Sequence, residues 1–471
     1  MNYTSTRGNV QQTTAEEAIL HGLSPDGGLY IPLAFPSLPD GESLRSLSYP
    51  DLLSTVLSPF FSLISKEELK ESAEQAYQSF SHPVPVQLVE REDMAVLELF
   101  HGPTLAFKDM ALCFLPHLMQ LAKKHLGREE NTLLLTATSG DTGISAIEGF
   151  SGVEGFSTIV FYPKDGVSPL QERQMLTTRA KNAMVIGLRG NFDDAQRGVK
   201  QMLADVRFHQ RLQNKGWRVA SANSINLGRL LAQIVYYVYA SLHVKSVPLR
   251  FSVPTGNFGN VLAAHWARKM GAPIAELLIA TNENDVLDRF FQSGVYDAGR
   301  ELIRSQSPSM DILVSSNLER LLHETGGVEE VRRAMNELET SRRFHWSHPF
   351  SGFRSGSVQE YEVREEIRRV WSEEQILLDP HTAVASSLLH RRKEKGIVVA
   401  TASPFKFPSF VLESLGKTSS HDPIQDLEAL SALTDLPLPE PMQKLEDSQR
   451  TQERICRKED MEANVLEVLH V

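Results

Sequence analysis

The chain has 471 residues and a formal net charge of −11, and a length of this kind predicts two or three packed domains. The acidic excess argues against nucleic acid as a partner, because a phosphate backbone selects a basic surface. No apolar run approaches the ~20 residues of a membrane span, and the first residues lack the apolar core of a signal peptide, so we expect a cytoplasmic protein without membrane contact.

Residues 1–95 are predicted to form a separate N-terminal domain. A turn-rich segment at 24–28 precedes helical patterns that include 67–80, and Pro83 and Pro85 then interrupt the chain. From about Val96 onward short apolar runs alternate with helical patterns, which is typical of mostly parallel sheets in an α/β fold. The expected strands are 132–136, 157–162, 183–188, 247–253, 277–280 and 397–401.

The expected helices between these strands have one apolar face each. They include 110–125, 225–243 and 261–270. The pattern divides the chain into a large α/β domain, a small α/β domain and peripheral C-terminal helices. The predicted bounds are 96–130 with 245–425 for the large domain, 131–244 for the small domain and 426–471 for the C-terminal helices.

Two glycine-rich turns follow expected strands, at the strand ends where parallel sheets bind ligands. The turn 256–260 has the sequence Gly-Asn-Phe-Gly-Asn, and its N–H groups at a helix start suit a phosphate. It matches neither the nucleoside-triphosphate loop nor the dinucleotide fingerprint. The turn 138–142 is rich in hydroxyls and suits a carboxylate. Each turn alone is equally consistent with an ordinary strand-to-helix turn.

Lys108 closes an apolar stretch and stands at a predicted helix start. Burial beside Phe107 and the helix dipole would lower the pKa of its ammonium toward the neutral amine that forms imines. A solvated lysine is the ordinary alternative. An imine lysine, a phosphate turn and a carboxylate turn together match pyridoxal 5'-phosphate, whose aldehyde, phosphate and amino-acid substrate need all three. Only two cysteines occur, Cys113 and Cys456, so no disulfide framework and no metal site is expected.

Ordered sequence blocks along nearly the whole chain resemble the threonine synthase family, in its longer bacterial and fungal subtype. The blocks are 27–32 (GGLYIP), 100–109, 136–143 (TATSGDTG), 168–172 (SPLQE), 221–226 (SANSIN), 256–260, 309–311 (SMD) and 379–383 (DPHTA). The resemblance implies a fold-type II pyridoxal-phosphate enzyme, similar to the tryptophan synthase β-subunit. Two parallel-sheet α/β domains would accompany the N-terminal domain, and the large domain would hold the cofactor.

The resemblance also implies roles for single residues. Lys108 would be the catalytic Schiff-base lysine, and Thr401 would face the pyridine nitrogen with a neutral hydroxyl. The cofactor phosphate would bind to the loop of Gly256, Asn257, Phe258, Gly259 and Asn260. Substrate contacts are expected from Thr138, Ser139, Gly140, Asp141, Thr142, Lys164, Asn223, Arg229 and Lys406.

The implied enzyme is a carbon–oxygen lyase acting on phosphate esters, in threonine biosynthesis. It would convert O-phospho-L-homoserine and water to L-threonine and phosphate by γ-elimination and β-addition, with Lys108 moving the protons. The small-molecule substrate is then the expected partner of a monomer or homodimer.

The sequence departs from the family at Ser403 and Phe405, where histidine and alanine are usual. If Ser403 lined the site, the missing imidazole would remove a proton relay. Two alternatives therefore stay open: another fold-type II lyase or synthase acting on a different hydroxy- or phospho-amino acid, and a cofactor-binding homologue with weakened catalysis.

Overall fold

Two mainly parallel β-sheets form the framework of the protein. We analysed a computed structural model that describes residues 1–471 except 10, 447, 449–452 and 470–471. The strand orders are β15-β7-β6-β5-β8 in the smaller sheet and β13-β10-β9-β14-β4-β3 in the larger one. All neighbouring strands in both sheets are parallel except β3, which pairs antiparallel with β4.

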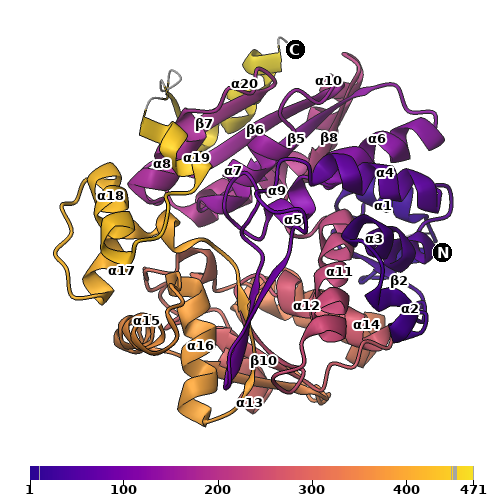
Figure 1. Cartoon of the computed structure of the whole chain (residues 1–471). Helices are drawn as coiled ribbons and strands as arrows, with labels where there is room; N and C mark the ends of the chain where they lie inside the picture. The colour runs from indigo at the N-terminus through magenta and orange to yellow at the C-terminus, as the bar shows by residue number, and fades with distance from the viewer. Residues whose placement is uncertain (10, 447, 449–452, 470–471) are drawn as a thin grey trace.

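Each sheet lies in its own lobe of the molecule, as Figure 1 shows. The small lobe contains β5 (Asn131–Ala137), β6 (Phe156–Pro163), β7 (Ala183–Arg189), β8 (Trp217–Ser221) and β15 (Arg454–Arg457). The large lobe contains β3 (Gln87–Glu90), β4 (Met94–Glu98), β9 (Arg250–Pro254), β10 (Glu276–Thr281), β13 (Phe353–Ser357) and β14 (Gly396–Ala400).

Helices cover both sheets. Those beside the small sheet are α7 (Asp141–Gly149), α8 (Pro169–Leu176), α9 (Phe192–Ala204), α10 (Val206–Gln213) and α20 (Met461–Leu469). The large lobe and the connections to it contain α5 (Asp109–Leu112), α6 (Leu115–His125), α11 (Leu227–His243), α12 (Gly259–Lys269), α13 (Val286–Ser293), α14 (Leu318–Ser341), α15 (Glu360–Glu374), α16 (Pro380–Arg392), α17 (Pro408–Ser414), α18 (Pro423–Thr434) and α19 (Glu440–Glu446). No helix in the described part of the chain is long and apolar enough to cross a membrane.

The N-terminal segment packs against the large lobe through a shared apolar core. It contains β1 (Tyr3–Ser5), α1 (Ala15–His21), β2 (Tyr30–Pro32), α2 (Gly41–Arg45), α3 (Tyr49–Leu57) and α4 (Lys66–Ala76). Ile19 and Leu53 are fully buried in the same cluster as Leu231 and Tyr237 of α11. A small two-stranded sheet of β11 (Val295–Asp297) and β12 (Arg343–His345) completes the fold. The domain bounds drawn from the sequence stay a prediction.

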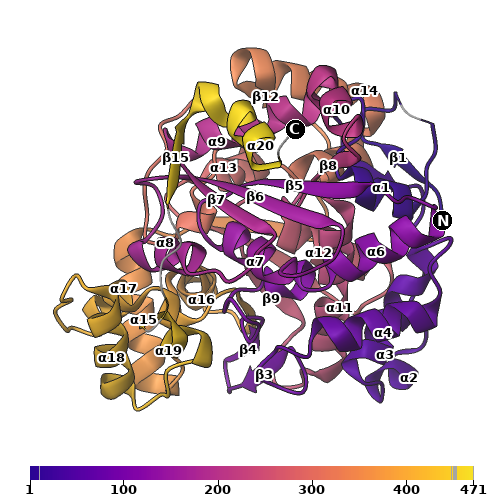
Figure 2. The same cartoon turned by 90° about the horizontal axis from the view of Figure 1, so that it is seen from above.

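The expected strands are present with shifted ends, and two differences have physical causes. The strand expected from 247 begins at Arg250, because Pro248 has no N–H for a sheet hydrogen bond. The C-terminal segment, expected to form helices only, also adds β15 to the edge of the small sheet beside β7 (Figure 2). Parallel pairing with β7 satisfies backbone groups that this edge would otherwise expose.

The helix expected at 110–125 is broken into α5 and α6. Pro116 lacks an N–H, and in a continuous helix its ring would clash with the carbonyl of Leu112, so the first helix ends at that residue. The Leu112 carbonyl oxygen instead lies against Gly149 at the end of α7, where a Cβ would approach it to 2.1 Å. A glycine at this position therefore permits the close contact between α5 and α7.

This contact predicts the effect of Gly149→Ala. The new methyl group would meet backbone rather than a flexible side chain, so we expect a loss of about 1–3 kcal/mol in the free energy of unfolding, larger than the ~1 kcal/mol gain in helix propensity. Unfolding in urea measures this change in the free energy of unfolding. Gly41→Ala is the matched control, because its nearest neighbour is the tip of the Leu242 side chain at 3.3 Å. Equal stability of the two variants would contradict the prediction.

Candidate active site

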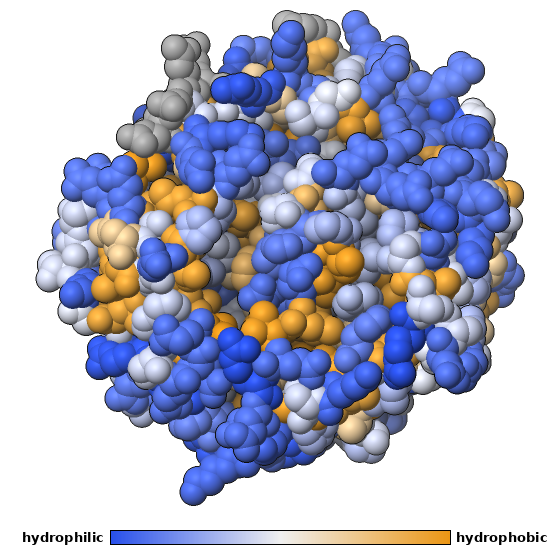
Figure 3. Space-filling view, viewed as in Figure 1, coloured by the Kyte–Doolittle hydropathy of each residue, from blue (hydrophilic) through white to orange (hydrophobic). Residues whose placement is uncertain are grey.

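A cleft opens where strands of both sheets end. Ala137, Ser221, Pro254 and Thr401 line it, and they lie at or just after the carboxyl ends of β5, β8, β9 and β14. Ligands bind at these ends in parallel α/β sheets. The space within the cleft is about 1130 Å³, part of it open to solvent. Most of the face in Figure 3 is hydrophilic, and apolar side chains gather across its middle, between the lobes.

Backbone hydrogen bonds hold the segment before Lys108 beside the segment after β14. The N–H of Phe107 donates to the carbonyl of Thr401 at 2.8 Å, and the N–H of Ser403 donates to the carbonyl of Leu105 at 3.0 Å. Leu105 has a φ of 60°, a left-handed conformation that is uncommon for leucine and marks a locally strained turn. This pairing brings Lys108 and Thr401 to the same cleft.

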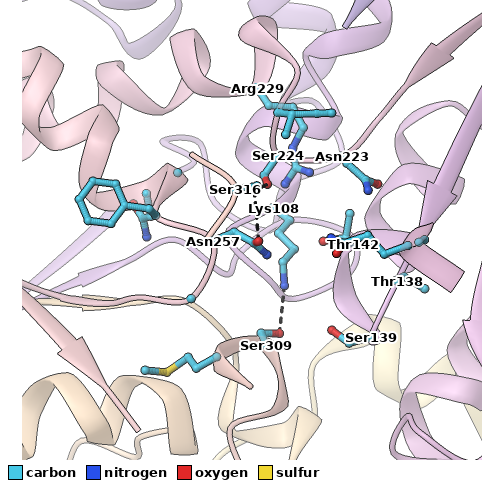
Figure 4. Close-up of a pocket in the computed structure, with 18 of the residues that line it drawn as sticks. Lys108, Thr138, Ser139, Thr142, Asn223, Ser224, Arg229, Asn257, Ser309 and Ser316 are labelled. Carbon is cyan, nitrogen blue, oxygen red and sulfur yellow. Dashed lines mark hydrogen bonds between the residues drawn. The ribbon is translucent and has the colours of Figure 1, made fainter. Parts of the chain in front are cut away.

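Lys108 stands directly before α5, as predicted, and its side chain points into the centre of the cleft (Figure 4). Its Nζ lies 3.2 Å from Asp141 Oδ2 and 3.2 Å from Ser309 Oγ. Burial lowers the pKa of Lys108 below its usual value, Lys406 and Arg229 lower it further, and Asp141 opposes them. The predicted direction is thus present, with burial as its largest cause.

Asp141, at the start of α7, is buried and charged. Burial opposes its ionisation, but Lys108, Lys406 and His381 outweigh that effect and hold its pKa well below the usual range. The carboxylate is not among the groups that line the cleft. It lies behind Lys108 and binds its amine.

The loop 256–260 turns sharply at the start of α12. A Cβ on Gly256 would lie 2.7 Å from the carbonyl oxygen of Ser309, so only glycine fits there. Phe258 has a φ of 65°, and its ring packs against Phe291 with centroids 5.8 Å apart. The side chain of Phe258 thus anchors the loop, while the loop's N–H groups lie at the positive end of the α12 dipole.

Asn260 directs an amide group toward the cleft. The hydroxyls of Tyr236 and Tyr237 both donate to its Oδ1, at 2.6 and 2.7 Å. Its Nδ2 is buried and has no hydrogen-bond partner within the protein. Such a donor beside a helix N-terminus fits an anion.

Arg229, from α11, is a second cation at the cleft wall. One of its terminal nitrogens donates to the carbonyl of Ala222 at 2.9 Å, whereas its Nε is buried without a partner. No carboxylate pairs with it among the residues that the structure describes. Burial lowers its pKa to about 10, so it remains protonated at neutral pH. A buried guanidinium of this kind fits an anionic ligand.

The turn 138–142 borders the opposite side of the cleft (Figure 4). Thr138 uses its hydroxyl within the turn, where Oγ1 accepts the N–H groups of Gly140 and Gly143 at 3.0 and 2.9 Å. Ser139 and Thr142 line the cleft beside it. Hydroxyls at a helix start suit a carboxylate.

The structure brings most of the predicted site residues to one cleft. Those that line it are Lys108, Thr138, Ser139, Thr142, Asn223, Arg229, Gly256, Asn257, Phe258, Gly259, Asn260 and Thr401. Gly140 and Asp141 lie behind this surface. Lys406 is buried against Asp141, and Lys164 forms ion pairs with Glu172 and Glu453. Neither lysine lines the cleft.

Ser309 and His381 are among the cleft residues that were not predicted as site residues. Ser309 contacts Lys108, and its N–H donates to His381 Nε2 at 3.2 Å. The other ring nitrogen, Nδ1, lies 2.8 Å from Asp379 Oδ1. Both residues lie in sequence blocks that resemble the family, 309–311 and 379–383, and this was the signal that could have identified them.

The two departures from the family pattern lie outside the cleft lining. Ser403 Oγ accepts the N–H of Phe405 at 3.3 Å and caps a short helical turn. Phe405 is packed in the apolar core of the large lobe. Ser403 therefore caps a turn and does not line the cleft, so the missing imidazole at this position removes no proton relay from the cleft.

The described residues contain no group of three or more His, Cys, Asp or Glu side chains that could hold a metal ion. The cleft instead offers a buried amine, an N–H loop at a helix start and unpartnered donors of Asn260 and Arg229. These groups fit a cofactor with an aldehyde and a phosphate, with room left for an anionic substrate.

Comparisons with known proteins give the same result. Residues 2–77 match the family "Threonine synthase N terminus", and residues 88–401 match "Pyridoxal-phosphate dependent enzyme". Threonine synthases of Schizosaccharomyces pombe and Pseudomonas aeruginosa are 38 % and 40 % identical, over 90 % and 87 % of this chain and 91 % and 90 % of theirs. The crystal structure of PLP-bound threonine synthase from Brucella melitensis has a TM-score of 0.86 at 35 % identity, over 99 % of this chain and 98 % of that one. The chain therefore belongs to the threonine synthase family of pyridoxal-phosphate-dependent enzymes.

Proposed function

We propose that this enzyme converts O-phospho-L-homoserine and water to L-threonine and phosphate. The observation that carries the proposal is the side chain of Lys108, buried with a lowered pKa at the centre of a cleft that also holds the guanidinium of Arg229, whose Nε has no hydrogen-bond partner. The first group suits a cofactor lysine, and the second suits a substrate with an additional anionic group.

Lys108 would hold the cofactor covalently through Nζ. The N–H groups of 256–260 and the amide of Asn260 would bind its phosphate, and Thr401 would place a neutral hydroxyl at the pyridine nitrogen. Support comes from the common lining of the cleft by all of these residues. When bound, pyridoxal phosphate supplies an electron sink that stabilises negative charge on the substrate's carbon atoms.

The protein's part in the reaction is to bind, orient and move protons. Once the substrate's amino group has taken its place on the cofactor, the free Lys108 amine would remove a proton from Cα and, after passing that proton on, would remove one from Cβ as phosphate leaves from Cγ. It would return protons as water adds to Cβ. Ser309 and Asp141 lie within 3.2 Å of Nζ and would fix its position between these atoms.

The substrate's two anionic groups would bind on opposite sides of Lys108. We assign the carboxylate to the turn of Ser139 and Thr142, and the phosphate to Arg229 with Asn223 beside it. Lys164 and Lys406 are not part of this proposal, because each is already paired with carboxylates outside the cleft lining.

Product analysis tests the reaction. Incubation with O-phospho-L-homoserine should release phosphate and threonine in equal amounts, and Lys108→Ala should lower the rate by about 10³-fold or more. Borohydride reduction of the native enzyme should label the peptide that contains Lys108. Phosphate release without threonine would instead indicate another lyase, and bound cofactor without turnover would indicate a weakened homologue.

The hydrogen bonds of Tyr236 and Tyr237 to Asn260 lead to a prediction about cofactor affinity. Replacing Tyr236 and Tyr237 by phenylalanine together removes the donors that orient Asn260, so its amide can rotate away from the phosphate. We expect the dissociation constant of the cofactor to rise about tenfold, measured by titrating the visible absorbance.

Tyr3→Phe is the control for this variant, because it removes an equally buried hydroxyl that donates to the carbonyl of Phe60, far from the cleft. Unchanged cofactor affinity in the double variant would show that Asn260 does not bind the phosphate.

The assignment of Arg229 to the substrate phosphate leads to a prediction about substrate affinity. In Arg229→Met the KM for O-phospho-L-homoserine should rise about tenfold or more, because a charge-assisted contact is lost. Inhibition by homoserine, which lacks the phosphate, should be unchanged. The variant should be at least as stable as the native enzyme, since a buried cation without a carboxylate has been removed.

Arg250→Met is the matched control, since that arginine pairs with Glu276 at the opposite end of β9. An equal weakening of homoserine and phosphohomoserine would contradict the assignment of Arg229 to the phosphate.

A further inference from the structure

A second buried lysine shares the carboxylate that binds Lys108. Lys406 Nζ lies 3.0 Å from Asp141 Oδ1 and donates to the carbonyl of Thr104 at 2.7 Å. Its side chain is 0 % exposed, whereas that of Lys108 is 10 % exposed toward the cleft. Lys406 thus does not line the cleft, and among the described residues its polar contacts are Asp141 and the backbone carbonyl of Thr104.

The four donors around Asp141 are divided between its two oxygens. Oδ2 lies near Lys108 and Ser309, at 3.2 and 3.4 Å. Oδ1 accepts from Lys406 and from Gln171 Nε2, at 3.0 and 2.9 Å. The two lysines therefore do not compete for one oxygen, and either contact can persist when the other is lost.

The charges show what this arrangement does. With both lysines protonated, two ammonium groups face one carboxylate. When Lys108 loses its proton or forms a covalent bond, Lys406 and Asp141 remain as a balanced buried pair. Without Lys406 the same change would leave a buried carboxylate without a cation, which is strongly unfavourable.

We propose that Lys406 is a positioning residue that holds Asp141 in place and balances its charge, so that Lys108 can act as a neutral amine. This inference rests on the assignment of Lys108 as the cofactor lysine. It gives a function to a lysine that the sequence placed in the substrate site.

Other groups around Lys108 and Asp141 also affect the pKa values of these two residues. Asp141, Lys406 and Arg229 are the charged groups that affect the pKa of Lys108, and Ser309 and the Phe107 ring contact it directly. His381 also acts on Asp141. Burial raises the pKa of Asp109, the other carboxyl near Lys406, so it is a weaker counter-ion than Asp141. Removing the charge of Lys406 should thus make Lys108 harder to deprotonate.

Chemical labelling of Lys108 tests this inference without turnover. The full-length chain is freed of cofactor with hydroxylamine, and the rate at which acetic anhydride acetylates Lys108 is measured against pH by peptide mass spectrometry. Only the neutral amine reacts, so the rate follows the unprotonated fraction. Lys406→Met should slow labelling at pH 7.5 by about threefold to tenfold, and Asp141→Asn should accelerate it.

The double variant Lys406→Met with Asp141→Asn should label faster than Lys406→Met alone and slower than Asp141→Asn alone. A purely structural role for Lys406 would not produce opposite shifts that offset each other. An unchanged pH profile in Lys406→Met, or shifts of both single variants in the same direction, would overturn the proposal.

Circular dichroism checks that each variant folds. Lys395→Met is the control variant, because it removes an exposed lysine that is paired with Asp93. If Lys406→Met does not fold, the double variant is compared with Asp141→Asn, because neither of these variants contains an unpaired carboxylate at position 141. The double variant should still be labelled more slowly than Asp141→Asn. The labelling profile does not depend on the substrate, so absence of threonine synthesis would reject the proposed reaction without deciding this result.

Discussion

The ionised carboxylate of Asp141 is the interaction on which the site depends. A buried charge is costly unless it is paired and hydrogen-bonded, and Asp141 meets this requirement only with donors from both lobes. Gln171 comes from the small lobe, whereas Lys108, Ser309 and Lys406 come from segments of the large lobe. The carboxylate therefore couples the relative position of the two sheets to the position of the reactive amine.

The backbone around the cleft is also held in fixed positions. Strand ends of both sheets supply its walls, and the backbone pairing of 105–107 with 401–403 fixes the lysine against β14. The loop before α12 is anchored by the ring of Phe258 on one side and by Gly256 against Ser309 on the other. Rigid elements thus hold each polar group that faces the cleft.

The sequence was most informative where a signal is local. Apolar runs ended by turn residues located β5, β6, β7, β9, β10 and β14, but not β4, β8 or β13. The glycine turn at 256–260 and Lys108 could be picked out as candidates from their positions, whereas their roles came from the family resemblance. Contacts between distant segments were out of reach: nothing local pairs Lys406 with Asp141 or His381 with Ser309. Lys406 was consequently assigned to the substrate, although burial directs it elsewhere. Pro116 did carry a local signal for the break between α5 and α6, but the apolar periodicity across it was given more weight.

The strand β15 has a consequence for how the chain acquires its structure. It pairs with β7 although nearly the whole large lobe lies between them in the sequence. During synthesis on the ribosome, the outer edge of β7 therefore stays unpaired until residues 454–457 have emerged. An open parallel edge invites association with other nascent chains, so the last strand of the small sheet also ends a period of vulnerability to aggregation.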